Sequence, residues 1–303
     1  MNSDDQILQK PVIVLGAPRS GTSFLGRVLG KHRSLFYLRE PRLTWSYAND
    51  AKSDMLRSQD ARPAVVRHIR RTFAEQIRAA HKTRMLEKTP RNALRMAFID
   101  QIFPDAIYIH ILRSPIDTIL SIRSAWERNA HGLKNMMPGR MRQRMGEVNL
   151  RRMPHYAGEL LRRALPRSLG RRAVGHPVWG PRLPGLSQMV AEMDMLAIAC
   201  IQWRTCVEAA VYHGRTLPPQ RYREVRLDQV SSDMIRDLLA FAELDDDPAI
   251  FAYLDESFDA KRPSGRRKQV SSEDLATIRR WTHSTCAWLG EPLAAVGTPG
   301  VSE

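Results

Sequence analysis

Cysteines, acidic residues and long apolar runs are all scarce in this chain of 303 residues. Its three cysteines, Cys200, Cys206 and Cys286, lack metal-binding spacing, which argues against a disulfide-built or zinc-built scaffold and favours reduced thiols in a cytosolic protein. No apolar run reaches the ~20 residues of a membrane-spanning helix. The polar N-terminus shows no signal peptide. These shortages predict a cytoplasmic protein.

The shortage of acidic residues leaves the chain strongly basic. Its 32 Asp and Glu stand against 47 Lys and Arg, a net charge of +15, so an anionic ligand, partner or surface is expected. Most of the excess lies between residues 128 and 182, where thirteen Lys and Arg face two Glu. We interpret residues 128 to about 186 as a basic insertion in one domain spanning 1–303. It would serve as an acceptor-side lid or contact the inner face of an anionic membrane; a solvated basic surface is the alternative.

Short apolar stretches alternate with helical patterns along the rest of the chain. Strands are expected at 12–15, 34–39, 84–88, 106–112 and 221–227. Helices are expected at 22–29, 61–81, 91–102, 116–126, 189–212, 233–242 and 271–288, and the tail from about 292 to 303 is expected to be disordered. Such alternation predicts an α/β fold, a three-layer α/β/α sandwich around about five parallel strands.

One stretch joins the first strand to the first helix, Gly16-Ala-Pro-Arg-Ser-Gly-Thr-Ser23. Its G-x-x-x-x-G spacing is that of a phosphate-binding loop, where free amides and the positive end of the helix dipole meet. The lysine of nucleotide-triphosphate loops is missing, since Thr22 stands in its place, and Arg19 supplies a cation from within the loop. A guanidinium is a planar fork that suits phosphate or sulfate oxygens.

A second cation, Arg113, follows the apolar strand at 106–112. Mg²⁺-dependent phosphoryl-transfer enzymes hold the metal with an acid, usually at the end of such a strand. The sequence therefore predicts a site that binds a phosphorylated anion by cations and amides, without a metal.

Both motifs resemble motifs of one known family. The loop at 16–23 resembles the 5′-phosphosulfate loop of P-loop sulfotransferases, and Arg113-Ser-Pro-Ile-Asp-Thr-Ile-Leu-Ser121 resembles their 3′-phosphate motif. The resemblance is closest to the branch with tyrosylprotein sulfotransferases and bacterial enzymes, and covers roughly residues 10–127 and, more weakly, 189–290. It implies a fold like that of P-loop nucleotide hydrolases. It also implies transfer of a sulfuryl group from 3′-phosphoadenosine 5′-phosphosulfate to an acceptor hydroxyl or amine.

The resemblance also assigns residues. Arg113 and Ser121 would hold the 3′-phosphate of the donor, and the loop would hold its 5′-phosphate and sulfate through Arg19, Ser20, Gly21, Thr22 and Ser23. Arg19 is counted with the catalytic residues as well. The product would be adenosine 3′,5′-bisphosphate.

Three residues outside these motifs are candidates for the chemistry. The acceptor must lose a proton, and Glu40, after the second strand, matches a catalytic glutamate of the tyrosylprotein branch. A surface salt bridge to Arg39 or Arg42 is its alternative role. Lys88 matches a lysine that stabilises the leaving oxygen, with a solvated strand-end lysine as the alternative, and Arg42 matches an arginine on the acceptor side.

The C-terminal half departs from the family pattern. Leu227 stands where the family often has a tyrosine, which leaves Tyr222 as a substitute for holding the nucleotide. The segment 261–268 resembles a late basic loop that closes over the 3′-phosphate end, and its candidate residues are Ser264, Gly265 and Arg266. His110 lies inside an apolar strand, so it is interpreted as a hydrogen-bonded core histidine rather than a base.

Two other functions stay open at this point. One is a nucleotide kinase-like P-loop enzyme, which Thr22 and Arg113 disfavour. The other is a non-enzymatic basic module that binds nucleic acid or an anionic membrane through residues 128–182. Aromatic residues are sparse in that segment, so nucleic acid is the less favoured partner. A sugar, a lipid, a peptide and a small phenol all remain candidates for the acceptor.

Overall fold

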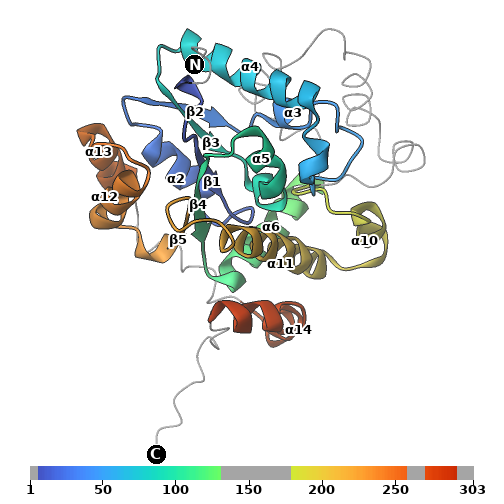
Figure 1. Ribbon diagram of the computed structural model, residues 1–303. Helices are drawn as coiled ribbons and strands as arrows, with labels where there is room; N and C mark the ends of the chain where they lie inside the picture. The colour runs from blue at the N-terminus through green and yellow to red at the C-terminus, as the bar shows by residue number, and fades with distance from the viewer. Residues whose placement is uncertain (1–5, 131–178, 258–269, 292–303) are drawn as a thin grey trace, which may run out of the picture.

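Five parallel strands form the centre of the molecule. The structure is a computed structural model that describes residues 6–130, 179–257 and 270–291. Its sheet has the strand order β2-β3-β1-β4-β5 (Figure 1). The strands are β1 (Val12–Leu15), β2 (Leu35–Arg39), β3 (Arg84–Lys88), β4 (Ile107–Leu112) and β5 (Tyr222–Arg226). All four neighbouring pairs are parallel, so the α/β prediction with about five strands is confirmed.

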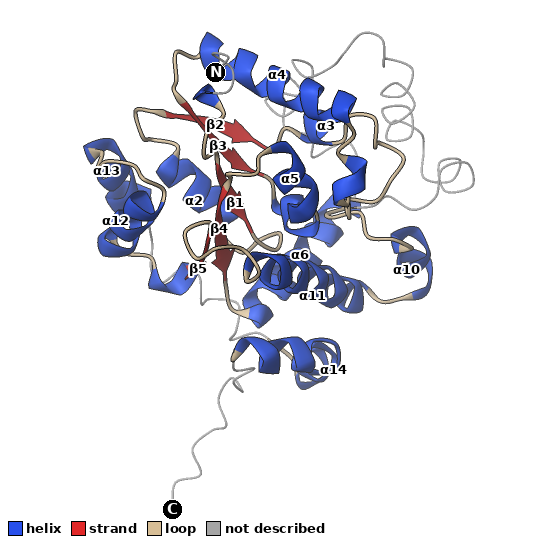
Figure 2. Ribbon diagram, in the orientation of Figure 1, coloured by secondary structure: helices blue, strands red, loops and turns tan. Residues whose placement is uncertain are grey.

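Helices cover both faces of this sheet (Figure 2). One face carries α2 (Thr22–Leu29), α12 (Ser232–Phe241) and α13 (Pro248–Ser257), and the other carries α4 (Pro63–Ala79), α5 (Met96–Ile102), α6 (Pro115–Ala130) and α11 (Met195–Gly214). The short α3 (Arg42–Trp45) and α10 (Leu186–Glu192) lie beside this second layer, and α14 (Ser272–Leu289) packs against α11. The result is the expected three-layer sandwich.

The residues of β1 show how the sheet divides the core. Val12 and Val14 pack into the cluster under α2 and α12, whereas Ile13 and Leu15 pack into the larger cluster on the other side. Successive side chains of a strand point to opposite faces, so a strand buried on both faces is apolar throughout. This is why the sequence pattern located the strands well.

Two expected helices are broken in the structure. The helix expected at 91–102 is a 3₁₀ turn, η2 (Pro90–Leu94), followed by α5, with Arg95 at φ −142° between them. The helix expected at 189–212 is α10 followed by α11, because Asp194 caps α11 by accepting hydrogen bonds from the amides of Leu196 and Ala197. Helix α13 was not expected from the sequence.

Some expectations fall on other parts of the chain. Most of the basic insertion, the candidate residues Ser264, Gly265 and Arg266, and the tail at 292–303 lie outside the described residues. Within the described ranges, no helix combines the length and the apolar character needed to cross a membrane. Cys200, Cys206 and Cys286 are free and buried, consistent with packing roles.

Candidate active site

The loop between β1 and α2 is shaped by two glycines. Gly21 has φ +104°, and a Cβ atom there would lie 2.8 Å from Cδ1 of Leu227. A Cβ on Gly16 would lie 2.6 Å from the carbonyl oxygen of Ile111. Gly21 stands directly before α2, where the first amides of a helix have no acceptor within the helix. The loop therefore presents backbone amides and a positive helix end to one point.

Arg19 joins this loop to the second motif. Its Nε donates a hydrogen bond of 3.1 Å to Oγ of Ser121 on α6, and its carbonyl oxygen accepts one of 3.3 Å from Nη1 of Arg113. Arg19 also has φ +72°, a left-handed conformation that is uncommon for a side chain other than glycine. The two motifs recognised in the sequence thus meet in space.

Ser20 lies inside the same loop. Its side chain is buried, and Oγ has no hydrogen-bond partner among the described residues. A buried hydroxyl without a partner is costly, so the loop is incomplete as it stands and suits a ligand that bears hydrogen-bonding oxygens.

Glu40, Lys88 and Arg42 form a second charged group beside the loop. Lys88 donates hydrogen bonds of 2.6 Å to Oε1 of Glu40 and 3.1 Å to Oγ of Ser23. Arg42 donates one of 2.5 Å to Oε2 of Glu40. The Lys88 side chain is completely buried, so it is not a solvated strand-end lysine. The alternative pair between Glu40 and Arg42 does form, but Lys88 shares the carboxylate.

These contacts control the ionisation of Glu40. Burial by itself would raise the pKa of the Glu40 carboxyl, but the charges and hydrogen bonds of Arg42 and Lys88 outweigh it and lower the pKa to about 2. Burial lowers the pKa of Lys88, and Glu40 opposes that change. Glu40 is therefore a carboxylate at neutral pH, with little affinity for a proton while both cations hold it.

A buried ring of four side chains supports this charged group from behind. Glu87 accepts hydrogen bonds from Nε1 of Trp45 at 3.0 Å and from Nδ2 of Asn92 at 2.6 Å. Nε of Arg95 donates to Oδ1 of Asn92 at 2.8 Å, and its guanidinium lies 5.5 Å from the centre of a Trp45 ring. All four residues are buried. We call this set the buried ring.

The buried ring connects the segments that carry the charges. Glu87 precedes Lys88 on β3, Trp45 ends the short helix that begins at Arg42, and the Asn92–Arg95 bond stabilises the break between η2 and α5. Sequence reasoning missed the ring. The signal for it in the sequence was an acid, Glu87, directly after the apolar pair Met85-Leu86 in a short strand.

A second feature that the sequence did not reveal is an arginine cluster around Asp54. The Asp54 carboxylate lies 3.1 Å from Nη1 of Arg91 and 3.4 Å from Nε of Arg182, and it accepts a 2.6 Å hydrogen bond from the Arg182 amide. Burial raises the pKa of Asp54, but Arg91, Arg95 and Arg182 outweigh it and lower the pKa. We call Arg91, Arg95 and Arg182 the arginine cluster.

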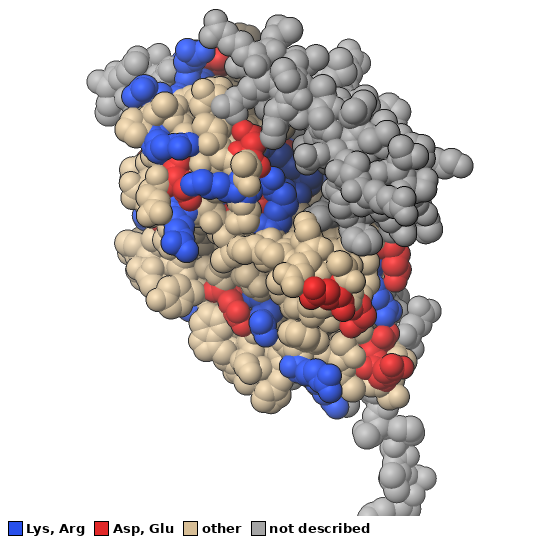
Figure 3. Space-filling view, turned by 90° about the vertical axis from the view of Figure 1, so that its right-hand side faces the viewer, with Lys and Arg blue, Asp and Glu red and all other residues tan. Residues whose placement is uncertain are grey.

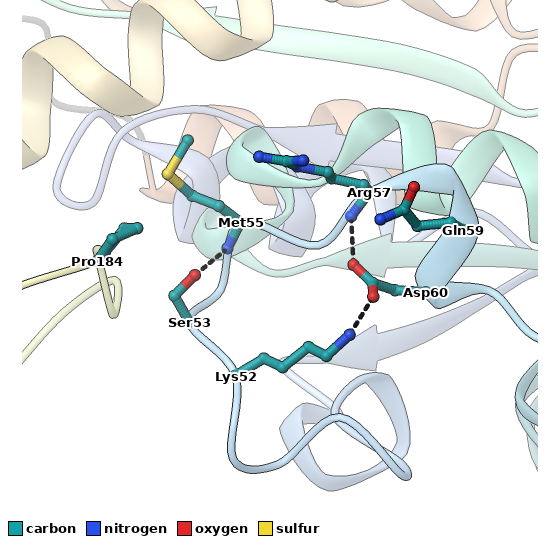
Figure 4. Close-up of a pocket in the computed structure, with 7 residues that line it drawn as sticks. All are labelled: Lys52, Ser53, Met55, Arg57, Gln59, Asp60 and Pro184. Atoms are coloured by element: carbon teal, nitrogen blue, oxygen red, sulfur yellow. Dashed lines mark hydrogen bonds and ion pairs between the residues drawn. The ribbon is translucent and has the colours of Figure 1, made fainter.

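A hollow of about 440 Å³ adjoins the Asp54 segment (Figure 4). Its wall is formed by Pro184 and by residues of the segment 52–60, in which Lys52 is paired with Asp60. The Asp60 carboxylate also accepts a 2.8 Å hydrogen bond from the amide of Arg57. These contacts curl the segment around the hollow, next to the point where Asp54 meets Arg182.

The remaining positions discussed from the sequence are Leu227, Tyr222 and His110. Leu227 packs against Gly21. Tyr222, by contrast, is the first residue of β5, so it lies at the amino-terminal end of the parallel strands, and its hydroxyl lies 2.7 Å from Nδ1 of His110. Tyr222 therefore does not substitute for the absent tyrosine. His110 is fully buried, as expected for a core histidine, and burial lowers its pKa to about 4.

Ten of the thirteen residues assigned from the resemblance lie in the described part of the chain, and all ten belong to the loop, the second motif or the charged group beside them: Arg19, Ser20, Gly21, Thr22, Ser23, Glu40, Arg42, Lys88, Arg113 and Ser121. Within the described ranges, no group of three or more His, Cys, Asp or Glu side chains is arranged to hold a metal ion.

Comparison with known proteins supplies the family. The nodulation protein NoeE of Sinorhizobium fredii is 27% identical over 142 residues, which make up 42% of this chain and 34% of NoeE. The chain thus spans about a third of this curated relative. The sulfotransferase STF9 of Mycobacterium avium superposes with a TM-score of 0.50 at 12% identity, covering 92% of this chain and 76% of STF9, which supports the fold.

A further solved structure is mouse sulfotransferase SULT7A1 complexed with PAP, with a TM-score of 0.46 at 12% identity over 96% of this chain and 90% of that one. The model of the sulfotransferase family matches residues 11–163, half of the sequence, which include the loop, the second motif and the three charged residues beside them. The chain therefore belongs to the sulfotransferase family.

Proposed function

We propose that this protein moves a sulfuryl group from 3′-phosphoadenosine 5′-phosphosulfate to an acceptor hydroxyl. The observation that carries the proposal is the meeting of two charged groups at one loop. Arg19 links the loop to Ser121 and Arg113, and Lys88 links it, through Ser23, to Glu40. Membership of the family supports sulfuryl transfer, and this arrangement supports the donor and the direction of attack.

The described residues fit the donor. The loop packs tightly against the protein, because a side chain at Gly16 or Gly21 would collide with Ile111 or Leu227, and the buried Ser20 hydroxyl lacks a partner among the described residues. The amides at the start of α2 would hold the 5′-phosphate and sulfate, with Arg19. Arg113 and Ser121 would hold the 3′-phosphate, which ATP and GTP lack. Roles for Ser264, Gly265 and Arg266 in the same grip remain a prediction.

The charged group beside the loop would perform the transfer. The acceptor oxygen attacks sulfur, the bond from sulfur to the phosphate oxygen breaks, and the acceptor proton passes to Glu40. Lys88 would neutralise the charge that develops on the leaving oxygen, and Arg42 would face the acceptor. Such transfer depends mainly on positioning and on stabilisation of charge.

Lys88 also offers a way to raise the proton affinity of Glu40. Its ammonium reaches both Ser23 in the loop and Glu40, so it can exchange the carboxylate for an oxygen of the donor. Loss of one of the two cations that hold the pKa of Glu40 near 2 would raise that pKa. Glu40 would then act as a base only when the donor is in place.

Calorimetry with adenosine 3′,5′-bisphosphate, ATP and GTP tests the proposal before any acceptor is known. The bisphosphate should bind at least ~10-fold more tightly than either triphosphate, because Arg113 and Ser121 would make charged hydrogen bonds to its 3′-phosphate. Added Mg²⁺ should not change the order. Tighter binding of ATP with Mg²⁺, or Mg²⁺-dependent ATP turnover, would instead support the kinase-like alternative.

A further inference from the structure

The arginine cluster holds more positive charge than its acid can balance. Asp54 is 3% exposed at its side chain and faces Arg91 and Arg182, and the charge of Arg95 also acts on it. Nearby, Arg42 and Lys88 share the single carboxylate of Glu40. With Glu87, whose charge acts on Arg95 and Lys88, these contacts place five cations around three carboxyl groups, Glu40, Asp54 and Glu87, in one region of the described structure.

The cations of this region repel one another. Burial lowers the pKa of Arg91 to about 10; Asp54 opposes this change, and the charges of Arg42, Arg182 and Arg95 add to it. Nε of Arg91 is buried and has no hydrogen-bond partner among the described residues. Poorly solvated positive charge is costly unless an anion pairs with it. Asp54 alone therefore leaves part of the positive charge of the cluster without an anionic partner in the described structure.

Two members of the cluster and Arg42 can reach a ligand. The exposed fraction of the side chain is 18% for Arg91, 39% for Arg182 and 40% for Arg42. On the face that carries α10, Figure 3 shows Lys and Arg side chains gathered around a recess near the middle. Arg95, by contrast, is buried behind them in the ring with Trp45 and Asn92.

The donor does not account for this charge. The proposed phosphate contacts lie at Arg19, Arg113 and Ser121, which bond to one another. Arg91 comes from η2 and Arg182 from the segment before α10, and the contacts of both run to Asp54 rather than to the loop. Arg42 lies between the two groups, since it holds Glu40 and its charge acts on Arg91.

We propose that Arg42, Arg91 and Arg182 form an anion subsite, and that the acceptor carries an oxyanion (a carboxylate, sulfate or phosphate) in addition to the hydroxyl that receives the sulfuryl group. The proposal rests on the proposed function, because Glu40 marks where that hydroxyl lies. Guanidinium groups bind such oxyanions through paired hydrogen bonds. The acceptor of this enzyme is thus an anionic molecule.

Inorganic sulfate tests the subsite directly. The full chain is first saturated with adenosine 3′,5′-bisphosphate, and sulfate is then titrated by calorimetry. Sulfate should bind to the wild-type protein, and its Kd should rise at least ~10-fold in Arg91→Gln and in Arg182→Gln, since hydrogen bonds to charged groups are worth about 1.5–3 kcal/mol. The matched control is Arg71→Gln on α4, an exposed arginine paired only with Glu75 on the surface in the described structure, which should leave the Kd unchanged.

Two precautions keep the result decisive. Arg91→Gln removes a partner of buried Asp54 and can impair folding, whereas Arg182→Gln keeps the amide hydrogen bond that Arg182 makes to Asp54. If Arg91→Gln does not fold, the sulfate affinity of Arg182→Gln tests the proposal. Sulfate held in the loop rather than in the subsite would instead be lost in Lys88→Ala and kept in both arginine variants, which would overturn the proposal.

Two further outcomes distinguish a failure of the anion subsite from a failure of the proposed function. If the protein binds adenosine 3′,5′-bisphosphate but no sulfate, the anion subsite is wrong while the sulfotransferase proposal stands. If it does not bind the bisphosphate at all, the proposed function itself fails. Once an acceptor is found, removing its anionic group should raise KM at least ~10-fold in the wild-type enzyme and much less in Arg182→Gln.

Discussion

The proposed donor side of the site depends strongly on the backbone of one loop, whereas the proposed acceptor side depends on side chains from separate segments. On the proposed donor side, Gly16 and Gly21 let the loop pack directly against Ile111 and Leu227, and the start of α2 supplies amides. On the proposed acceptor side, Glu40 follows β2 and Lys88 ends β3, and Glu87 accepts hydrogen bonds from Trp45 and Asn92 beside them.

The two sides also differ in what specifies their geometry. A loop whose shape depends on positive φ values and close backbone contacts is specified by a few consecutive residues. A charged group such as Glu40, Arg42 and Lys88 is specified by the strand order and by the ring behind it. We therefore expect substitutions on the donor side to change nucleotide binding, and those on the acceptor side to change catalysis or stability.

The largest effect is expected at Glu40. Glu40→Gln should lower kcat by ~10²–10⁴-fold, the usual contribution of a general base, while the Kd for adenosine 3′,5′-bisphosphate changes less than ~2-fold because Glu40 does not contact the donor. Transfer of labelled sulfate and calorimetry measure the two quantities. Glu75→Gln on α4 is the control. Normal turnover by the Glu40 variant would show that Glu40 is not the base and that the two sides do not have separate roles in binding and catalysis.

The next largest effect is expected on stability. Glu87→Ala leaves Nε1 of Trp45 and Nδ2 of Asn92 buried without an acceptor, and each such donor costs about 1–3 kcal/mol. Urea unfolding should show a loss of about 3 kcal/mol in the free energy of unfolding. The control, Glu75→Ala, should lose less than about 0.5 kcal/mol because its pair with Arg71 lies on the surface. Equal losses would show that the ring does not support the acceptor side.

A smaller effect should separate the two sides by binding. Arg19→Ala and Arg113→Ala should each weaken binding of adenosine 3′,5′-bisphosphate by ~10–100-fold through loss of charged hydrogen bonds. Arg182→Gln, on the acceptor side, should change the Kd less than ~2-fold. Calorimetry at matched salt concentration measures these Kd values. A comparable loss in the Arg182 variant would mean that both sides hold the nucleotide.

A last effect concerns pH and contrasts two carboxyls of the proposed acceptor side. Burial raises the pKa of Glu87 from 4.5 to about 7, against hydrogen bonds from Thr89 and Trp45 and the charges of Arg95 and Lys88. The folded state then holds more protons than the unfolded state between these values, so Glu87 makes the protein less stable as pH rises from 4.5 to 7. Glu40, with its pKa lowered to about 2, contributes stability above pH 4.5 that is lost as pH falls toward 2.

Urea unfolding at pH 5 and pH 8 measures the Glu87 contribution. The difference in unfolding free energy between wild type and Glu87→Gln should shift in favour of the variant at the higher pH, because glutamine does not ionise. A difference that is the same at both pH values would show that Glu87 does not titrate in this window.

Much of the fold was predictable because its signals are local. The five strands and the break of the chain at Gly16 and Gly21 follow from apolar runs and turn residues within a few positions of one another. The two helices that were expected to be continuous show the limit of this reasoning. Arg95 and Asp194 interrupt them through side-chain hydrogen bonds to Asn92 and to the start of α11, which periodicity does not report.

The sequence by itself determined the parallel α/β architecture, the glycine-containing loop at 16–23 and the pair of cationic motifs, because their signals lie within short runs of residues. Only the tertiary structure decided that Lys88 shares Glu40 with Arg42, that Glu87 lies in a buried ring, and that Asp54 meets Arg182 across 128 residues of sequence. The physical reason is that strand order and packing choose the partners of a side chain, whereas a short run of residues specifies only its own backbone.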